Sequence, residues 1–209
     1  KRKNNFNRNI GDRNINIFTK WKKLGMSVRY VDVDELTVSK CNVRSWVDQE
    51  AVKKLADNIL KHGLINPLVV RREDGKLGVV CGRMRMEAIK LIKTEKPSEY
   101  KRLFPRGVPV VVRELSDKEA ILLSLSENLR QNTMSRDEVG AALHRLQEEF
   151  GLTLRDIIGE IQLAAEEIKA ALRVYRAVKA VGAEKFRKPG RPPKITRERE
   201  GIAGVAAVK

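Results

Sequence analysis

The stretch VVCGRMRMEAIKLI, residues 79–92, carries the signal that decides the fold. It begins as a short apolar run, as in a buried strand, and continues after Gly82 with apolar residues at helical spacing. A strand that runs through a glycine into a helix leaves unpaired N–H groups at the positive end of the helix dipole, where anions bind. Because Arg83 and Arg85 follow at once, the stretch predicts an anion-holding junction for a nucleotide or a DNA phosphate. We call residues 82–85 the glycine junction.

Strand and helix signals alternate on both sides of this stretch. Apolar residues recur at helical spacing after Asp48, a residue typical of helix N-caps, and stop at Gly63. Two apolar runs flank Asp74-Gly75, which is a strong hairpin signal. The expected elements of this half are a strand over 28–36, a helix over 48–62, two strands around Asp74-Gly75, a helix over 83–93 and a strand over 108–115.

After residue 115 the strand signals stop and helix signals take over. Ser116 with Glu119, and Ser135 with Glu138, have the spacing of capping boxes at helix starts. A short helix is expected from about Thr153, with a break near Gln162 and a longer helix over 164–179. Two helices with so short a joint predict a helix-turn-helix.

The basic residues concentrate at the two ends of the chain. The 209 residues include 43 Lys+Arg against 27 Asp+Glu, a net charge of +16. Residues 1–23 hold eight basic and one acidic residue, and residues 185–199 hold seven basic and one acidic residue. Basic segments poor in hydrophobic residues fit a polyanion, because each neutralised phosphate releases a counterion. Nucleic acid is the expected partner, and solubility or contact with anionic lipid is the alternative.

Several other classes of protein do not fit the composition. At 42% hydrophobic residues the chain can bury a core, yet no apolar run approaches the ~18 residues of a membrane span. The start of the sequence lacks the apolar block of a signal peptide, so we expect a soluble intracellular protein with no membrane partner. Cys41 and Cys81, with only His62 and His144, do not make a disulfide framework or a standard zinc site. Cys81 is expected to pack as a reduced thiol, and a redox or metal role is the alternative.

Three stretches in this order resemble the ParB family of DNA-partition proteins, within the ParB/sulfiredoxin-like superfamily. They are LADNILKHGLINPLVV at 55–70, CGRMRMEAIKL at 81–91 and SENLRQNTMSRDEVGAALHRLQEEFGLT at 126–153. The second resembles the family's Gly-Glu-Arg-Arg box, and the third its Glu-Asn-x-x-Arg segment. The resemblance covers about residues 28–178.

The resemblance implies an α+β fold, with a small mixed-sheet ParB/sulfiredoxin-like N-terminal domain followed by an all-helical helix-turn-helix domain. We expect a basic arm over 1–26, the α/β domain over 27–115, the helical domain over 116–182 and a basic tail over 183–209. Family members bind a centromere-like DNA site, many bind CTP with Mg²⁺, and they work as dimers with a ParA-type partition ATPase. The implied function is plasmid or chromosome partition in the cytoplasm, on the nucleoid.

The residues expected to bind nucleotide or phosphate come from the three family stretches. They are Gly63, Pro67, Gly82, Arg83, Arg85, Glu127, Asn128 and Arg130. The chain departs from the family where Arg83 replaces a carboxylate, Met84 replaces the first arginine and Gln131 replaces an arginine. Met and Gln cannot make the two-pronged hydrogen bonds of an arginine side chain. Two possibilities therefore remain: the chain binds CTP, or its nucleotide pocket is too incomplete to do so. Without the resemblance, Arg83 and Arg85 would read as a solvated helix face, and Glu127 and Asn128 as a helix C-terminal turn.

The DNA-binding residues are expected in the second helix of the helix-turn-helix and in the tail. The helix starts with Ala164, Ala165, Glu166 and Glu167, whose carboxylates repel phosphate, so a purely structural helix is the alternative. The tail segment RKPGRPPK, 187–194, resembles an AT-hook, in which a glycine and an arginine enter the minor groove of A·T-rich DNA; a simple linker is the alternative. The candidates are Lys169, Arg173, Arg176, Arg187, Lys188, Gly190, Arg191 and Lys194.

Two rival functions remain at this point. The first is a ParB-like enzyme, either a nuclease or a nucleotide-dependent phosphotransferase, with CTP hydrolysis as a variant. Cys81 precedes Gly82, whereas the catalytic cysteine of sulfiredoxins follows that glycine, and no clustered two-metal set is visible. We therefore single out no catalytic and no metal-ligating residue. The second rival is an architectural protein that coats DNA without sequence preference.

Overall fold

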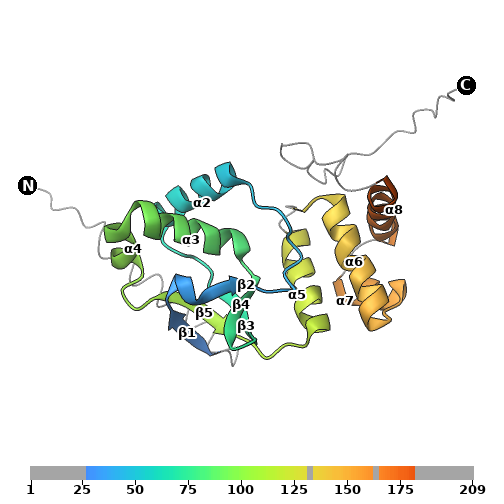
Figure 1. The fold of residues 1–209 in the computed structure, drawn as a ribbon, viewed down its shortest axis with the longest axis horizontal. Coiled ribbons are helices and arrows are strands. Elements are labelled where there is room, and N and C mark those ends of the chain that lie inside the picture. The colour runs from blue at the N-terminus through green and yellow to red at the C-terminus, as the bar shows by residue number, and fades with distance from the viewer. Residues whose placement is uncertain (1–26, 131–133, 162–164, 182–209) are drawn as a thin grey trace, which may run out of the picture.

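The computed structural model describes residues 27–130, 134–161 and 165–181 (Figure 1). The first half contains β1(Val28–Val31), a 3-10 turn η2(Val33–Glu35), β2(Leu36–Val38), α2(Gln49–His62), β3(Leu68–Glu73), β4(Lys76–Cys81), α3(Arg83–Glu95), α4(Pro97–Leu103) and β5(Val108–Val112). The second half contains α5(Asp117–Arg130), α6(Arg136–Phe150), α7(Leu154–Ile161) and α8(Ala165–Val181). The expected α+β class, a mixed sheet followed by a helical region, is confirmed.

The five strands form one mixed sheet in the order β1-β5-β3-β4-β2. β1 with β5 and β3 with β4 are antiparallel, whereas β3 with β5 and β2 with β4 are parallel. The hairpin expected at Asp74-Gly75 is confirmed between β3 and β4. Both turn residues have positive φ, 48° and 78°, which is the backbone of the tight primed turns that join twisted strands.

The single strand expected over 28–36 is wrong, because Asp32 breaks it. The Asp32 carboxylate accepts a hydrogen bond from the backbone N–H of Asp34, and Glu35 bonds back to the N–H of Asp32, which closes a 3-10 turn. The turn separates β1 from β2, and these two strands lie at opposite edges of the sheet. The strand expected over 108–115 ends at Val112, and α4, which begins at Pro97, was not predicted.

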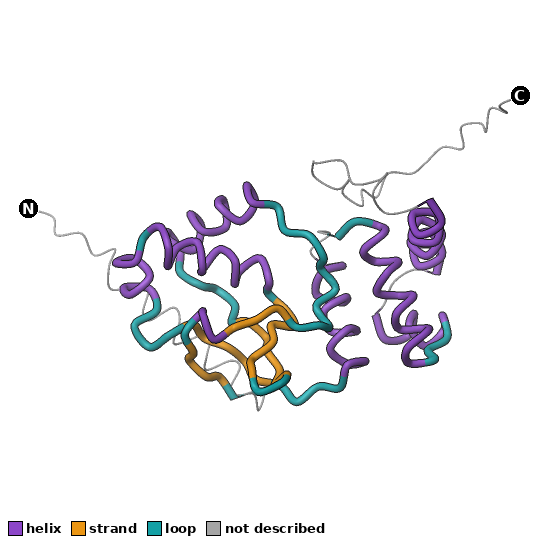
Figure 2. Tube along the Cα trace, in the orientation of Figure 1, coloured by secondary structure: helices purple, strands orange, loops and turns teal. Residues whose placement is uncertain are grey.

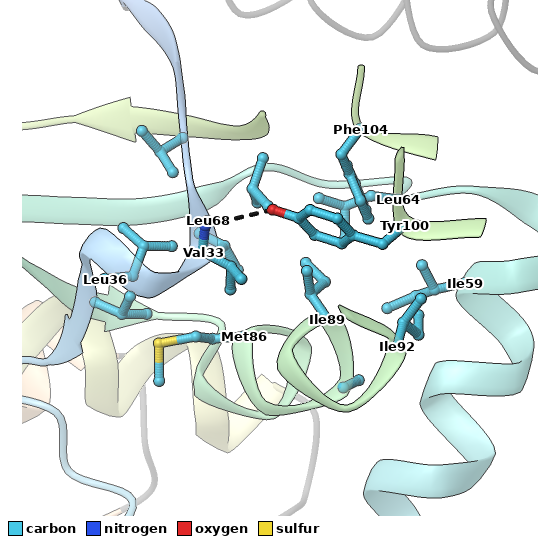
Figure 3. Close-up of a cluster of buried hydrophobic side chains, with 14 of the residues drawn as sticks. Val33, Leu36, Ile59, Leu64, Leu68, Met86, Ile89, Ile92, Tyr100 and Phe104 are labelled. Carbon is cyan, nitrogen blue, oxygen red and sulfur yellow. Dashed lines mark hydrogen bonds between the residues drawn. The ribbon is translucent and has the colours of Figure 1, made fainter. Parts of the chain in front are cut away.

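Helices α2, α3 and α4 cover one face of the sheet (Figures 1 and 2). The expected caps of α2 are confirmed: the Asp48 carboxylate accepts from the N–H groups of Glu50 and Ala51, and Gly63 ends the helix with φ 76°. Between these helices and the sheet lies a buried hydrophobic cluster, part of which is drawn in Figure 3. The hydroxyl of Tyr100 on α4 accepts a long 3.5 Å hydrogen bond from the N–H of Val33, which ties α4 to the 3-10 turn.

The opposite face of the sheet packs against the helical half. Val80 and Cys81 of β4 belong to a second hydrophobic cluster that continues through α5, α6, α7 and α8. Both cysteines are buried free thiols, as expected, and burial raises the pKa of Cys81 to about 12, so this thiol is protonated at neutral pH. This cluster contains residues from before and after residue 115. The domain boundary expected at residue 115 therefore remains a prediction.

A buried arginine attaches α5 to the sheet. Arg71 on β3, 4% exposed, donates to Glu73 and Asp117 at 2.6 Å each and to the carbonyl of Leu115 at 3.1 Å. The hydrogen bond from Arg71 lowers the pKa of the Asp117 carboxyl. Gly78 leaves room for Glu73, since a Cβ there would lie 2.4 Å from its Oε2. The contact sets the position of α5, whose far end faces the glycine junction.

The helical half is built on the predicted caps and one close helix crossing. Both capping boxes are confirmed, Ser116 with Glu119 and Ser135 with Glu138. α6 and α8 cross at Gly140, where an added Cβ would lie 2.3 Å from the carbonyl oxygen of Ala171. Within 27–130, 134–161 and 165–181, no helix is long and apolar enough to cross a membrane.

Replacing Gly140 by alanine should destabilise the fold by at least about 2 kcal/mol, because the new methyl group meets backbone at the α6–α8 crossing. The matched control is Gly159→Ala in α7, where nothing lies within 4 Å and removing a helical glycine should stabilise by about 0.5–1 kcal/mol. Urea unfolding of both variants measures the difference. Equal effects of the two substitutions would contradict the close crossing.

Candidate functional site

Three segments enclose the glycine junction. They are residues 42–47 before α2, residues 63–67 after α2, and the C-terminal end of α5 with the start of α6 (Figure 1). Arg83 bonds to the first segment, and Arg85 bonds to the second segment and to Glu127 of α5. The start of α6 is linked to the junction indirectly, through residues 45 and 46.

Gly82 makes room for the side chain of Arg85. Its φ of 99° lies in the left-handed region, and a Cβ at this position would lie 2.9 Å from the guanidinium carbon of Arg85 and 2.8 Å from Leu68. Arg85 donates to the carbonyls of Asn66 and Pro67 at 2.8 and 2.7 Å, and pairs with Glu127 at 3.3 Å. Gly82 therefore has two roles: it allows the backbone turn into α3, and it leaves space for the guanidinium group of Arg85.

Arg83 holds the segment on the other side of the junction. Its Nη1 donates to the carbonyl of Arg44 and, at 3.4 Å, to that of Ser45. Its Nε atom is buried and has no hydrogen-bond partner within the described part of the chain. The interpretation of Arg83 and Arg85 as a solvated helix face is therefore wrong, because backbone carbonyls hold both guanidinium groups.

Arg44 is buried beside the end of α5. It is 9% exposed and donates from Nε and Nη2 to Asn128 at 3.2 and 2.8 Å. Asn128, 4% exposed, donates in turn to the carbonyl of Ser124 at 2.7 Å. Burial lowers the pKa of the Arg44 guanidinium, while the nearby carboxylates of Glu138 and Glu127 act in the opposite direction. The interpretation of Asn128 as only part of a helix C-terminal turn is therefore incomplete, because its side chain also positions the buried guanidinium group of Arg44.

Glu138 connects the same segment to α6. Its Oε1 accepts from the N–H and hydroxyl of Ser45 at 2.8 Å each and from the N–H of Trp46 at 3.2 Å. Its Oε2 accepts from the N–H and hydroxyl of Ser135 at 3.2 Å each. This carboxylate, 8% exposed, is both the predicted capping residue of α6 and an unpredicted tether to residues 45–46.

The structure brings together most of the candidate nucleotide residues. Arg83, Arg85, Gly82, Pro67, Glu127 and Asn128 all lie at the junction. Gly63 caps α2 at the far end of the 63–67 segment, and Arg130 is exposed at the end of α5. Sequence reasoning missed Arg44, Ser45 and Glu138; only the capping-box spacing of Glu138 was a signal for any of them. Gln131 lies outside the described residues.

The arrangement can hold an anion through arginine side chains. Arg83 and Arg85 belong to the junction, Arg44 is joined to Arg83 through its backbone carbonyl, and Glu127 pairs with Arg85 at 3.3 Å. An arriving phosphate would compete with the backbone carbonyls for these N–H groups, and charge-assisted bonds to phosphate are the stronger. Within the three described ranges, no group of three or more His, Cys, Asp or Glu residues could hold a metal ion.

A second surface lies on α8. Ile168, Ala171 and Leu172 are buried, and Lys169, Arg173 and Arg176 are exposed on the other side of the helix. Lys169 pairs with Glu166 at 3.0 Å and lowers the pKa of the Glu166 carboxyl. α8 therefore packs through one face and presents a row of cations on the other. The tail candidates Arg187, Lys188, Gly190, Arg191 and Lys194 lie outside the described residues.

Comparison with known proteins gives one matching family model and several curated relatives. The model of the ParB N-terminal domain matches residues 20–129. The chain is 27% identical over 149 residues to a probable chromosome-partitioning protein ParB of Coxiella burnetii, covering 71% of this chain and 48% of that protein. It is 26% identical over 147 residues to a nucleoid occlusion protein of Halalkalibacterium halodurans, covering 70% and 48%. The chain thus spans about half the length of the curated relatives it matches.

A solved structure with a TM-score of 0.50 shares the fold. C-terminally truncated ParB from Caulobacter crescentus, complexed to the centromeric parS site, matches with a TM-score of 0.50 at 20% identity, over 75% of this chain and 78% of that one. The same protein complexed with CTP-γ-S matches at a TM-score of 0.41 and 20% identity, over 77% of this chain and 88% of that one.

Replacing Glu138 by alanine should lower the free energy of unfolding by about 2 kcal/mol, because the part-buried hydrogen bonds from the N–H groups of Ser45 and Trp46 and from the Ser45 hydroxyl lose their acceptor, and the capping box with Ser135 is lost as well. Glu148→Ala is the control on the same helix; its side chain is 69% exposed, and we expect a change below about 0.5 kcal/mol. Chemical denaturation followed by circular dichroism measures both. A Glu138 variant as stable as the control would refute the tether.

Proposed function

This chain belongs to the ParB family, and from that premise we propose that it is a DNA-binding partition protein that also holds a cytidine nucleotide at the glycine junction. The proposal concerns plasmid or chromosome partition, and chromosome partitioning is the process in the name of the Coxiella burnetii relative. We propose that α8 and the basic terminal segments bind DNA, and that the arginines of the junction bind the nucleotide phosphates.

The cation row of α8 is the observation that supports DNA binding most directly. Lys169, Arg173 and Arg176 are spaced four and three residues apart, so they project from one side of the helix, and all three are exposed. Such a row suits the phosphates that flank the major groove when the second helix of a helix-turn-helix lies in it. In this proposal the segment around Arg191 adds contacts in the minor groove of A·T-rich DNA.

Nucleotide binding is supported by the chemistry of the junction. A triphosphate requires several cations, and Arg44, Arg83 and Arg85 lie in the junction or next to it. The residues thus fit the anionic part of CTP, the nucleotide that the family resemblance implies. Mg²⁺ would accompany the phosphates as it does in other nucleotide sites, where few protein carboxylates are needed. Met84 stands where the family has an arginine, so we expect weaker binding than a complete box would give.

We also propose the assembly that goes with this function. The protein would act as a dimer together with a ParA-type partition ATPase, associated with the nucleoid. Its two-fold symmetry would match paired half-sites in the DNA.

DNA binding by the full chain should fall steeply with salt, and the fall should depend on α8. Fluorescence anisotropy with a labelled duplex over a salt series measures the slope of log affinity against log salt. Replacing Lys169, Arg173 and Arg176 together by alanine should weaken binding and reduce that slope by roughly one per lost phosphate contact. The matched control replaces the exposed Lys53, Lys54 and Lys61 of α2, removing the same charge elsewhere. Equal slopes for the two triple variants would refute the role of α8.

Restoring the family's arginine should strengthen nucleotide binding. We expect Met84→Arg to tighten CTP binding in the presence of Mg²⁺ by about tenfold, the effect of one charge-assisted contact, and Arg85→Gln to weaken it. Isothermal titration calorimetry gives both affinities, and Arg102→Gln on α4 is the control. If CTP does not bind to the natural sequence or to the Met84 variant, the nucleotide part of the proposal is wrong.

A further inference from the structure

Glu166 occupies the centre of the exposed face of α8. Each residue of an α-helix turns by about 100°, so position 166 lies on the side opposite the buried Ile168, Ala171 and Leu172. The same outward ridge continues through Ala170 and Arg173. The Glu166 side chain is 76% exposed in the first turn of the helix, at the end that contacts bases in helix-turn-helix proteins.

A carboxylate at this place has few favourable partners on DNA. Phosphates repel it, so it lowers affinity unless it meets a hydrogen-bond donor on a base edge. In the major groove the donors are the N4 amino group of cytosine and the N6 amino group of adenine. Adenine presents an acceptor, N7, beside its donor, and this acceptor repels a second carboxylate oxygen. Cytosine has no such acceptor and is the better partner for an ionised glutamate.

The neighbours of Glu166 favour a base contact over a phosphate contact. Lys169 pairs with the carboxylate at 3.0 Å, and Arg173 adds positive charge nearby, so the carboxyl stays ionised and in place. Ala170, one turn further along the ridge, is too short to hold the helix away from the bases. Lys169 and Arg176 lie beside the ridge, where they would meet the sugar-phosphate backbone.

We propose that Glu166 is a specificity-determining residue that accepts a hydrogen bond from the N4 amino group of a cytosine in the major groove. The inference rests on the proposed DNA binding by α8 and adds the base that this helix selects. It also gives a function to the acidic start of a helix in an otherwise basic protein. Glu167, about 100° further round the helix, lies off the ridge and has no such role.

Selection from a random duplex library, followed by sequencing, tests the proposal with the full chain. The natural sequence should enrich one cytosine in each half-site. Glu166→Ala should lose that preference, and Glu166→Gln should shift it to adenine, because a glutamine amide pairs with N6 and N7 of adenine. Glu167→Gln is the matched control and should keep the cytosine.

Binding to the selected duplex and to a copy with that C·G pair replaced then gives the magnitude. We expect about a tenfold loss for the natural sequence and less than about twofold for Glu166→Ala. If Glu166 variants select the same bases as the natural protein, the inference is overturned, while DNA binding stands. If the natural protein binds with a steep salt dependence but selects no base, the inference also falls and the backbone-binding role of α8 stands. No binding at low salt would remove both.

Discussion

The peptide group between Ser45 and Trp46 is the point on which the arrangement of the site depends. Its carbonyl oxygen lies 3.4 Å from Nη1 of Arg83, and its N–H donates to Glu138 at 3.2 Å. One end of a single peptide unit is thus bound to the start of α3 and the other to the start of α6. Through Arg44 and Asn128 the same segment also reaches α5. The glycine junction and the helical half are therefore held by one short stretch of chain.

Glycine and buried charge set the geometry around that stretch. Gly82 makes room for Arg85, Gly78 for Glu73 and Gly140 for the backbone of α8, so each close approach has a residue without a side chain at its centre. Arg71 and Glu138 each bring together segments far apart in the sequence. Removing one partner from such buried networks leaves an uncompensated polar group, which makes them costly to disturb.

Local signals predicted most helices, caps and the hairpin, because these depend on residues three or four positions apart. The capping boxes at Ser116 and Ser135, the Asp48 cap and the Asp74-Gly75 turn are of this kind. The break at Asp32 was missed because the apolar spacing of 28–36 continues through it, although the Asp32 and Glu35 pair forms a capping box. The family order of motifs pointed to the junction residues, whereas Arg44 was missed because nothing in its neighbourhood distinguishes a buried arginine from an exposed one. Its burial depends on Asn128, which lies 84 positions away.

Hydrogen exchange of the full chain, followed by mass spectrometry, tests the central claim that the junction and α8 are two ligand surfaces of one protein. The account predicts that CTP with Mg²⁺ protects peptides covering residues 44–46 and 82–85, that duplex DNA protects α8, and that α4 is unchanged by either ligand. Protection spread evenly over the chain, or none with either ligand, would contradict it.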